Sequence, residues 1–443
     1  MSEGEKGFRV SWGWITVIIL VILSAIGIGI RSTVNSLLEL LFLMAVYTIV
    51  ALSLNLEAGF FDIPNFGKAV FAFIGAWAAV GIGGNITAVT IQHLYPETTQ
   101  EVLKITGGSH SSLLAAYLDH SYSTLTVQLM NKYLLMHPYL GLAMLLVALL
   151  GAIAIGGVLG LIAAYPALRL REDYLAILLL SFSELTVMNI FYQTPSLLGP
   201  QGLWVPYYLA IFKTTPKMAN TMIAFAIIAA ILIFMLSERL ANSPMGRLMR
   251  AVRDNELAAE TFGKDIVSIR KKVIIFTSAM AALGGFFVAV KSQTVQALNF
   301  HRIYYTFYPW AMMIVGGMGN NIGTVIGVVV IWLGVRLINV YQVTIGNLFH
   351  MPLDAVTQLD KILLGVLMLL ILYTRPEGIV PEKMSKTTDF EELADVSWRL
   401  EHSKIQEHPK NIGKKFLRKE RRKEMLMWLI ILIILAIWIV YII

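Results

Sequence analysis

Long apolar stretches recur along almost the whole of this 443-residue chain, and they restrict its fold more than any other feature. Stretches of about 18 or more apolar residues are long enough to cross a lipid bilayer. In hydrocarbon every backbone amide and carbonyl needs a partner within the protein, so such stretches form helices. Charged residues make up only 14% of the chain, against about a quarter in a typical soluble protein. The sequence therefore predicts an all-α, polytopic integral membrane protein.

The basic residues predict how the chain crosses the membrane. The longest charged stretch between apolar segments, residues 238–272, contains eight Lys and Arg residues, so the positive-inside rule predicts that it is cytoplasmic. Counting from this loop gives about ten spans, a cytoplasmic N-terminus and an external insert at residues 85–138. The spans are predicted at residues 14–30, 34–56, 60–84, 140–166, 174–193, 218–237 and 273–290, as a pair within 305–340, and at 359–373.

The sequence changes character after the last of these spans. Residues 384–424 form a charged cytoplasmic tail that ends in a basic run, and residues 425–443 are almost wholly apolar. We expect this final segment to be a further transmembrane helix or a membrane-lying anchor, with the basic run attracted to anionic lipid. Because excess Lys and Arg in a membrane protein mostly record its orientation, no nucleic-acid partner is expected.

No metal site is predicted. The chain has no cysteine, which excludes disulfides and thiolate-bound metals. The external insert holds four histidines, separated by 17, 10 and 17 residues, and this spacing matches no compact metal motif. We expect these histidines to be surface residues.

The predicted cytoplasmic loop carries the signals of a helical hairpin. Ser243 and Pro244 can begin one helix, with a hydroxyl cap and a proline at its first position. Apolar and basic side chains then fall on different faces of that helix. Asp254 or Asn255 can cap a second short helix, which Gly263 can end in a left-handed conformation. A capped, amphipathic hairpin favours a docking surface over a loop that only fixes topology.

This hairpin and three further segments resemble the LivM-type (LivH/LivM) permease subunits of branched-chain amino-acid ABC transporters. The hairpin segment begins at Ser243 and reads SPMGRLMRAVRDNELAAETFGKDIVSIRKKVIIFTSAMAALGGFF. The others, in family order, are LNLEAGFFDIPNFGKAVFAFIGAW, YLAILLLSFSELTVMNI followed by LLGPQGLWVP, and MMIVGGMGNNIGTVIG. A final RPEGIVPEK is similar to the short basic end of those permeases. The resemblance covers roughly residues 14–383, and it implies an ABC-importer permease domain over residues 1–383.

The resemblance implies a plasma-membrane subunit without its own ATPase. No G-x-x-x-x-G-K-S/T phosphate loop occurs in the sequence, so this chain would bind no cofactor, and partner subunits would bind ATP and Mg²⁺. By family pattern the partners are two cytoplasmic ATP-binding subunits, a second related permease and an extracytoplasmic solute-binding protein. The residues expected to couple to an ATPase are Gly246, Arg247, Arg250, Ala251, Arg253, Asp254, Asn255, Glu256, Ala258, Ala259 and Gly263.

The expected substrate path combines interrupted helices with polar groups at membrane depth. Glu184 is the best candidate because it lies well inside an apolar span among hydroxyl side chains, although a carboxyl that only packs helices fits equally well. Residues 62–68 precede an apolar helix whose positive end can face a solute carboxylate, and an ordinary turn is the alternative. The expected path residues are Asn65, Phe66, Gly67, Ser181, Ser183, Glu184, Gly199, Gly202, Gly316 and Gly317.

Two of these segments leave their role open. Relatives more often show a serine-containing run followed by Gly-His where this chain has Pro64, Asn65, Phe66, Gly67 and Lys68, which puts the substrate in doubt more than the fold. The glycines from Gly316 to Gly327 let a neighbouring backbone approach closely, so packing is expected first and pore lining second.

The resemblance implies an importer that translocates branched-chain amino acids or a similar small solute by alternating access, coupled to partner ATPases. Urea or short amides are the alternative substrates. An ion-coupled secondary transporter that uses Glu184 is the alternative mechanism. An enzyme is not expected, because the chain has no H-E-x-x-H motif and no persuasive Ser/His or paired-Asp arrangement at membrane depth.

Overall fold

The computed structural model describes residues 34–167, 170, 172–194, 199–212 and 215–382. These residues belong to the first of the chain's two units, Met1–Lys383. The predictions for residues 14–30, 384–424 and 425–443 lie outside the described residues.

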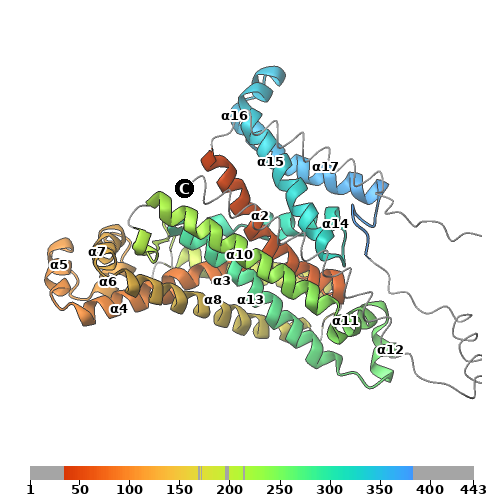
Figure 1. The fold of residues 1–443 in the computed structure, drawn as a ribbon, viewed down its shortest axis with the longest axis horizontal. Helices are drawn as coiled ribbons and strands as arrows, with labels where there is room; N and C mark the ends of the chain where they lie inside the picture. Colours follow the sequence, from red (N-terminus) through yellow and green to blue (C-terminus); the bar gives the residue numbers. More distant parts are fainter. Residues whose placement is uncertain (1–33, 168–169, 171, 195–198, 213–214, 383–443) are drawn as a thin grey trace, which may run out of the picture. The chain divides into compact units, whose positions relative to one another are not determined.

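Eight of the described helices are long and apolar enough to cross a membrane, which confirms the all-α, polytopic class (Figure 1). They are α2 (Val34–Leu54) with the π-helical turn η1 (Asn55–Gly59); α3 (Lys68–Ala78) continued by η2 (Ala79–Gly84) and α4 (Asn85–Leu94); α8 (Pro138–Ala167); α9 (Glu172–Glu184) with η3 (Leu185–Phe191); α10 (Thr215–Ala241); α13 (Ile266–Ser292); α15 (Asn321–Phe349); and α16 (Leu353–Thr357) with α17 (Leu359–Thr374).

Shorter elements connect these helices. They are α5 (Thr98–Ile105), α6 (Leu113–Leu118), α7 (Ser123–Met136), β1 (Leu203–Trp204), η4 (Ala210–Phe212), α11 (Pro244–Asp254), α12 (Glu256–Thr261), β2 (Thr294–Val295), η5 (Ala297–Phe300), η6 (Ile303–Phe307) and α14 (Tyr308–Gly316). The two strands form one antiparallel pair, in which Leu203 lies opposite Val295 and Trp204 opposite Thr294.

The predicted pair of spans within residues 305–340 is corrected by the structure. Only α15 is a long helix there, because α14, with its nine residues, and the five-residue turn η6 that leads directly into it are together too short to cross a bilayer. The α14 helix ends at Gly316 because Gly317 has a φ of 121°, which no helical residue adopts. The predicted span at residues 60–84 also differs, since its helix begins at Lys68 and continues to Leu94, into the predicted insert.

The α3 and α13 helices lie together in the core, and both are largely buried. Their backbones approach so closely that a Cβ atom on Gly75 would clash with the Ala282 carbonyl. In the reverse direction, a Cβ atom on Gly285 would clash with the carbonyl of Ala72. Small residues at such contacts let helices pack backbone to backbone.

Helices α8 and α13 run between two different ends of this unit (Figure 1). At the insert end, α4 to α7 gather around an apolar cluster of their own, which includes Ile91, Tyr117 and Met130. The Tyr117 hydroxyl donates a hydrogen bond of 2.9 Å to the carbonyl of Trp204, which ties this cluster to strand β1. At the other end, which we call the hairpin end, lies the pair α11 and α12.

Candidate functional site

The predicted hairpin is present, and its capping side chains are in place. The Ser243 hydroxyl accepts a hydrogen bond of 3.3 Å from the amide of Gly246 at the start of α11. At α12 the structure selects Asn255 over Asp254, since the Asn255 carboxamide oxygen accepts a hydrogen bond of 3.0 Å from the amide of Ala258. Gly263 follows α12 with a φ of 70°, in the left-handed region.

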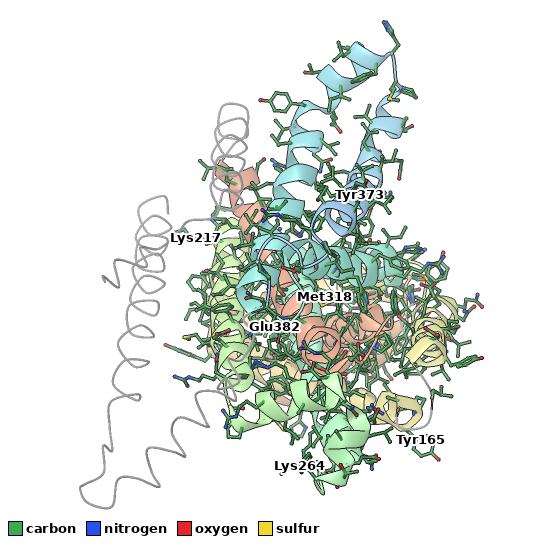
Figure 2. All side chains as sticks on the ribbon, turned by 90° about the vertical axis from the view of Figure 1, so that its right-hand side faces the viewer. Tyr165, Lys217, Lys264, Met318, Tyr373 and Glu382 are labelled. Atoms are coloured by element: carbon green, nitrogen blue, oxygen red, sulfur yellow. The ribbon has the colours of Figure 1, made fainter. Side chains whose placement is uncertain are left out.

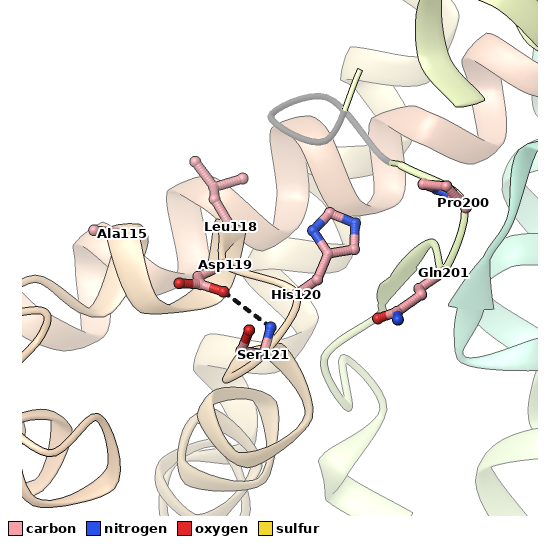
Figure 3. Close-up of a pocket in the computed structure, with 7 residues that line it drawn as sticks. All are labelled: Ala115, Leu118, Asp119, His120, Ser121, Pro200 and Gln201. Carbon is pink, nitrogen blue, oxygen red and sulfur yellow. Dashed lines mark hydrogen bonds between the residues drawn. The ribbon is translucent and has the colours of Figure 1, made fainter. Parts of the chain in front are cut away.

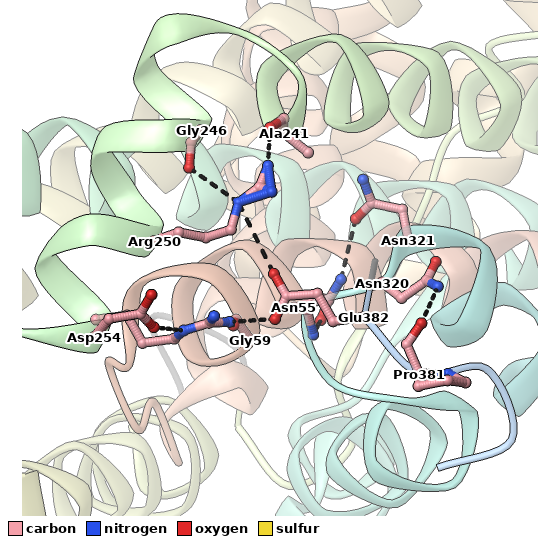
Figure 4. A network of polar contacts seen from close by, with 12 residues as sticks. Asn55, Gly59, Ala241, Gly246, Arg250, Asp254, Asn320, Asn321, Pro381 and Glu382 are labelled. Atoms are coloured by element: carbon pink, nitrogen blue, oxygen red, sulfur yellow. Dashed lines mark hydrogen bonds and ion pairs between the residues drawn. The ribbon is translucent and has the colours of Figure 1, made fainter. Parts of the chain in front are cut away.

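Two arginines that were expected to meet a partner, Arg250 and Arg253, point back into the chain itself, and Figure 4 labels the first of them. Arg253 Nη1 donates hydrogen bonds of 2.7 Å to the Gly59 carbonyl and of 2.8 Å to Glu382 Oε2. Arg250 donates to the Ala241 carbonyl, and its Nε lies 3.8 Å from Glu382 Oε1. These contacts fix α11 to the ends of three other segments, so Arg250 and Arg253 position the hairpin.

The outward face of the hairpin is formed by other residues. Among the expected coupling residues, Arg247, Ala251, Asp254, Asn255, Glu256, Ala258 and Gly263 are exposed, whereas Gly246 and Ala259 are buried. Sequence reasoning missed Leu257, which is 75% exposed, and Phe262, which is 81% exposed. We call these two side chains the apolar tip. Two apolar residues within a polar segment give only a weak sequence signal. Figure 2 labels Lys264, which follows the tip.

An amide network joins other elements beneath the hairpin (Figure 4). Asn55 of η1 donates a hydrogen bond of 3.0 Å to the side-chain oxygen of Asn321, and its own oxygen accepts one of 2.9 Å from the amide of Gly319. Asn321 in turn donates to Glu238 Oε2 at 3.1 Å. The network therefore links η1 to the start of α15 and to the end of α10.

The glycines around α14 lie in backbone packing. A Cβ atom on Gly316 would clash with the carbonyl of Gly323, and one on Gly317 with the carbonyl of Val380. The segment after α17 is held there by a hydrogen bond of 2.9 Å from the Val380 amide to the Gly316 carbonyl. Gly319 has a φ of 73°, and a side chain there would press on Glu382. In Figure 2 Met318 and Glu382 mark this region.

The charged pair Glu57 and Lys68 was also missed by sequence reasoning. Glu57 Oε2 and Lys68 Nζ lie 2.9 Å apart, and both side chains are 0% exposed. The hydroxyl of Thr277 on α13 donates to the other carboxylate oxygen of Glu57. A buried charge needs such partners. The pair gives a physical reason for a lysine at this buried position. The sequence signal that could have indicated this pair is two opposite charges, eleven residues apart, within a largely apolar segment.

Residues 62–67, which lie between these two charges, form a break between η1 and α3. Asn65 is 1% exposed, and its side-chain oxygen accepts a hydrogen bond of 2.9 Å from the Gly67 amide. The Thr306 hydroxyl accepts another of 3.2 Å from the Ala69 amide. Two amides at the start of α3 are therefore already engaged within the chain. Phe66 stacks on Trp310, with ring centroids 4.6 Å apart.

The remaining expected path residues lie on other elements. Glu184 ends α9, and its carboxylate lies 3.8 Å from the Arg302 guanidinium, with the side chains 25% and 45% exposed respectively. Ser183 beside it is buried, whereas Ser181 is exposed. Gly199 and Gly202 lie near β1 at the insert end, both with positive φ. The expected path residues are thus divided between the break, α9, the insert end and the α14–α15 packing.

An open cavity of about 690 Å³ lies at the insert end (Figure 3). Asp119 lines it, together with Ala115, Leu118, His120, Ser121, Pro200 and Gln201. His110 Nε2 lies 2.9 Å from Asp119 Oδ2, and this hydrogen bond lowers the pKa of the Asp119 carboxyl. His93 and His137 are exposed, and His110 and His120 are half-buried. In the described residues no group of three or more His, Cys, Asp or Glu side chains is placed to hold a metal.

Comparisons with known proteins cover most of these elements. The family described as "Branched-chain amino acid transport system / permease component" matches residues 36–372. The "Probable branched-chain amino acid transport permease protein LivM" of Methanocaldococcus jannaschii is 33% identical over 337 residues, which are 76% of this chain and 91% of that protein. The "High-affinity branched-chain amino acid transport system permease protein LivM" of Escherichia coli is 26% identical over 275 residues, 56% of this chain and 60% of its own length. The Salmonella typhimurium protein of the same name is 24% identical over 245 residues, which are 50% of this chain and 54% of that protein. No solved structure matches the chain significantly.

Proposed function

This chain belongs to the family of branched-chain amino acid transport permease components, and from that membership we propose that it is the transmembrane permease subunit of an ATP-driven importer. The proposed solutes are branched-chain amino acids, after the names of its relatives. They would cross by alternating access, driven by ATP hydrolysis on separate subunits. The absence of a phosphate-loop motif from the sequence supports this division of labour.

The observation that carries the proposal is the construction of the hairpin. Its arginines bind it to the transmembrane part, whereas Leu257 and Phe262 extend from it with most of their surface exposed. Apolar side chains held in the open on a polar segment are suited to bury against a partner protein. We propose that the apolar tip docks on a cytoplasmic ATP-binding subunit. The full assembly would hold two such subunits, a second related permease and an extracytoplasmic solute-binding protein.

The proposed docking also fixes the proposed orientation in the plasma membrane. The hairpin end would face the cytoplasm, in agreement with its eight Lys and Arg residues, and the insert end would face outward. With the predicted span at residues 14–30, the N-terminus would then be cytoplasmic.

Co-purification with the ATP-binding subunits tests the docking. The test variant is Leu257→Ser with Phe262→Ser, which removes the apolar tip. The matched control is Leu348→Ser with Phe349→Ser, because these two side chains are 70% and 63% exposed at the far end of α15. We expect the native chain and the control to retain the ATP-binding subunits, and the tip variant to lose them. Equal retention by the tip variant would refute docking through these two residues.

A further inference from the structure

The five-residue turn η1 makes contact with a different part of the chain through every second residue. Asn55 reaches the turn between α14 and α15, Glu57 reaches α3 and α13, and the Gly59 carbonyl receives Arg253 of the hairpin. The helix continues through Phe61, and the break at residues 62–67 follows it. The turn therefore lies between the hairpin and the break. Short π-helical turns of this kind occur often at functional positions in helices.

The contacts on the hairpin side are short and charge-assisted. Arg253 Nη1 lies 2.7 Å from the Gly59 carbonyl oxygen, and the same nitrogen binds Glu382. Hydrogen bonds from a guanidinium are stronger than those between neutral groups. A displacement of α11 would therefore pull on the backbone of the turn.

On the side away from the hairpin, Glu57 binds the turn η1 to Lys68, which directly follows the break. Lys68 is the first residue of α3, and its ammonium lies 2.9 Å from the Glu57 carboxylate with neither side chain exposed to solvent. Separating two such charges would leave each of them buried without its partner, which is costly. The Thr277 hydroxyl fixes the same carboxylate to α13. Movement of the turn must therefore carry Lys68 and the start of α3 with it.

We infer that η1 is the element that transmits movement of the hairpin to the break at residues 62–67, and that Glu57 and Lys68 are positioning residues for this step. The inference rests on the proposed function, because it needs an ATP-binding subunit to move the hairpin. It assigns the pair no contact with the solute.

Hydrogen exchange of the whole complex, with and without ATP, tests the inference. In the native complex we expect ATP to change exchange both in the hairpin, residues 244–263, and in the break. The test variant is Glu57→Gln with Lys68→Met, which removes both charges together and leaves neither unpaired. We expect this variant to bind the ATP-binding subunits and to keep the ATP-dependent change in the hairpin, while the change in the break is lost.

The outcomes separate the two proposals. A native complex without an ATP-dependent change in the hairpin would overturn the proposed function and this inference together. A variant that responds in both segments would overturn the inference alone, because the pair would then have only a structural role. Should the double variant fail to assemble, Arg253→Gln, which removes the bond from the hairpin to the Gly59 carbonyl, decides by the same readout: an unchanged response of the break counts against the inference.

Discussion

The charged pairs Glu57–Lys68 and Glu184–Arg302 differ in almost every respect. Glu57 and Lys68 are 2.9 Å apart with no exposed side-chain surface, and a third side chain hydrogen-bonds the carboxylate. Glu184 and Arg302 are 3.8 Å apart, and both are partly exposed. The first pair is fixed to its surroundings, and the second has room to change partners. The sequence drew attention to Glu184 and not to Glu57.

The difference shows what surrounding sequence can and cannot reveal. Glu184 stands out because serine and threonine flank it, yet only one of the two neighbouring serines is buried. Glu57 is flanked by Leu56 and Ala58 and gives no local sign of its partner. Its burial depends on the packing of η1 against α13, which brings Thr277 to it across 220 positions of sequence. Tertiary contacts, and not the composition of the neighbouring sequence, decide which carboxylate is buried with partners.

The largest expected effect comes from breaking the buried pair on one side only. Lys68→Met leaves the Glu57 carboxylate buried without its cation, so the free energy of unfolding should fall by about 3–5 kcal/mol. Glu57→Gln with Lys68→Met leaves no unpaired charge and should cost clearly less. Denaturant unfolding in detergent micelles measures both. Equal losses in the single and double variants would show that the two charges do not depend on each other.

A smaller effect is expected at the hairpin, where inward and outward arginines can be compared on one helix. Arg253→Gln loses the bonds to Gly59 and Glu382, and charged hydrogen bonds of this kind contribute up to about 3 kcal/mol each. Partial exposure of Arg253 reduces that figure. The control Arg247→Gln changes an exposed side chain and should stay within about 0.5 kcal/mol of the native chain. Proteolysis of the hairpin provides a second readout, with faster cleavage expected only for Arg253→Gln.

The loose pair should tolerate neutralisation. Glu184→Gln removes an ion pair that is long and partly exposed, so the expected loss of stability is below about 1 kcal/mol. Under the proposed mechanism, ATP-driven uptake into proteoliposomes should persist without any ion gradient. Uptake that vanishes in this variant and follows a proton or sodium gradient in the native chain would favour the ion-coupled alternative.

The smallest effect on stability is expected from the partly exposed hydrogen bond between His110 and Asp119. The hydrogen bond from His110 lowers the pKa of Asp119, so the stabilisation is present above the ordinary carboxyl pKa of about 3.9 and is lost as pH falls through the lowered value. The thermal midpoint of the native chain should exceed that of Asp119→Asn slightly at pH 6. This difference should shrink toward pH 3, and a difference that grows as the pH falls would mean that the protonated carboxyl is the stabilising form.

Features governed by short-range rules were predictable from the sequence. The length of apolar runs indicated the all-α polytopic class, and Ser243, Asp254 or Asn255, and Gly263 indicated the ends of the hairpin helices, with Asn255 chosen by the structure. The pair within residues 305–340 was predicted incorrectly because apolar composition alone does not show that α14 stops at Gly316. The inward turn of Arg250 and Arg253 depends on Glu382, which lies 129 positions from Arg253. No local pattern reveals a partner at that distance.

Reconstitution in sealed proteoliposomes tests the central claim most directly. The chain would be combined with its ATP-binding subunits, the second permease and the solute-binding protein, and uptake of labelled leucine would be measured with and without ATP. We predict uptake that requires ATP and all of these subunits, and none by the chain alone under an ion gradient. Uptake by the chain alone, driven by a proton or sodium gradient and indifferent to ATP, would contradict the claim.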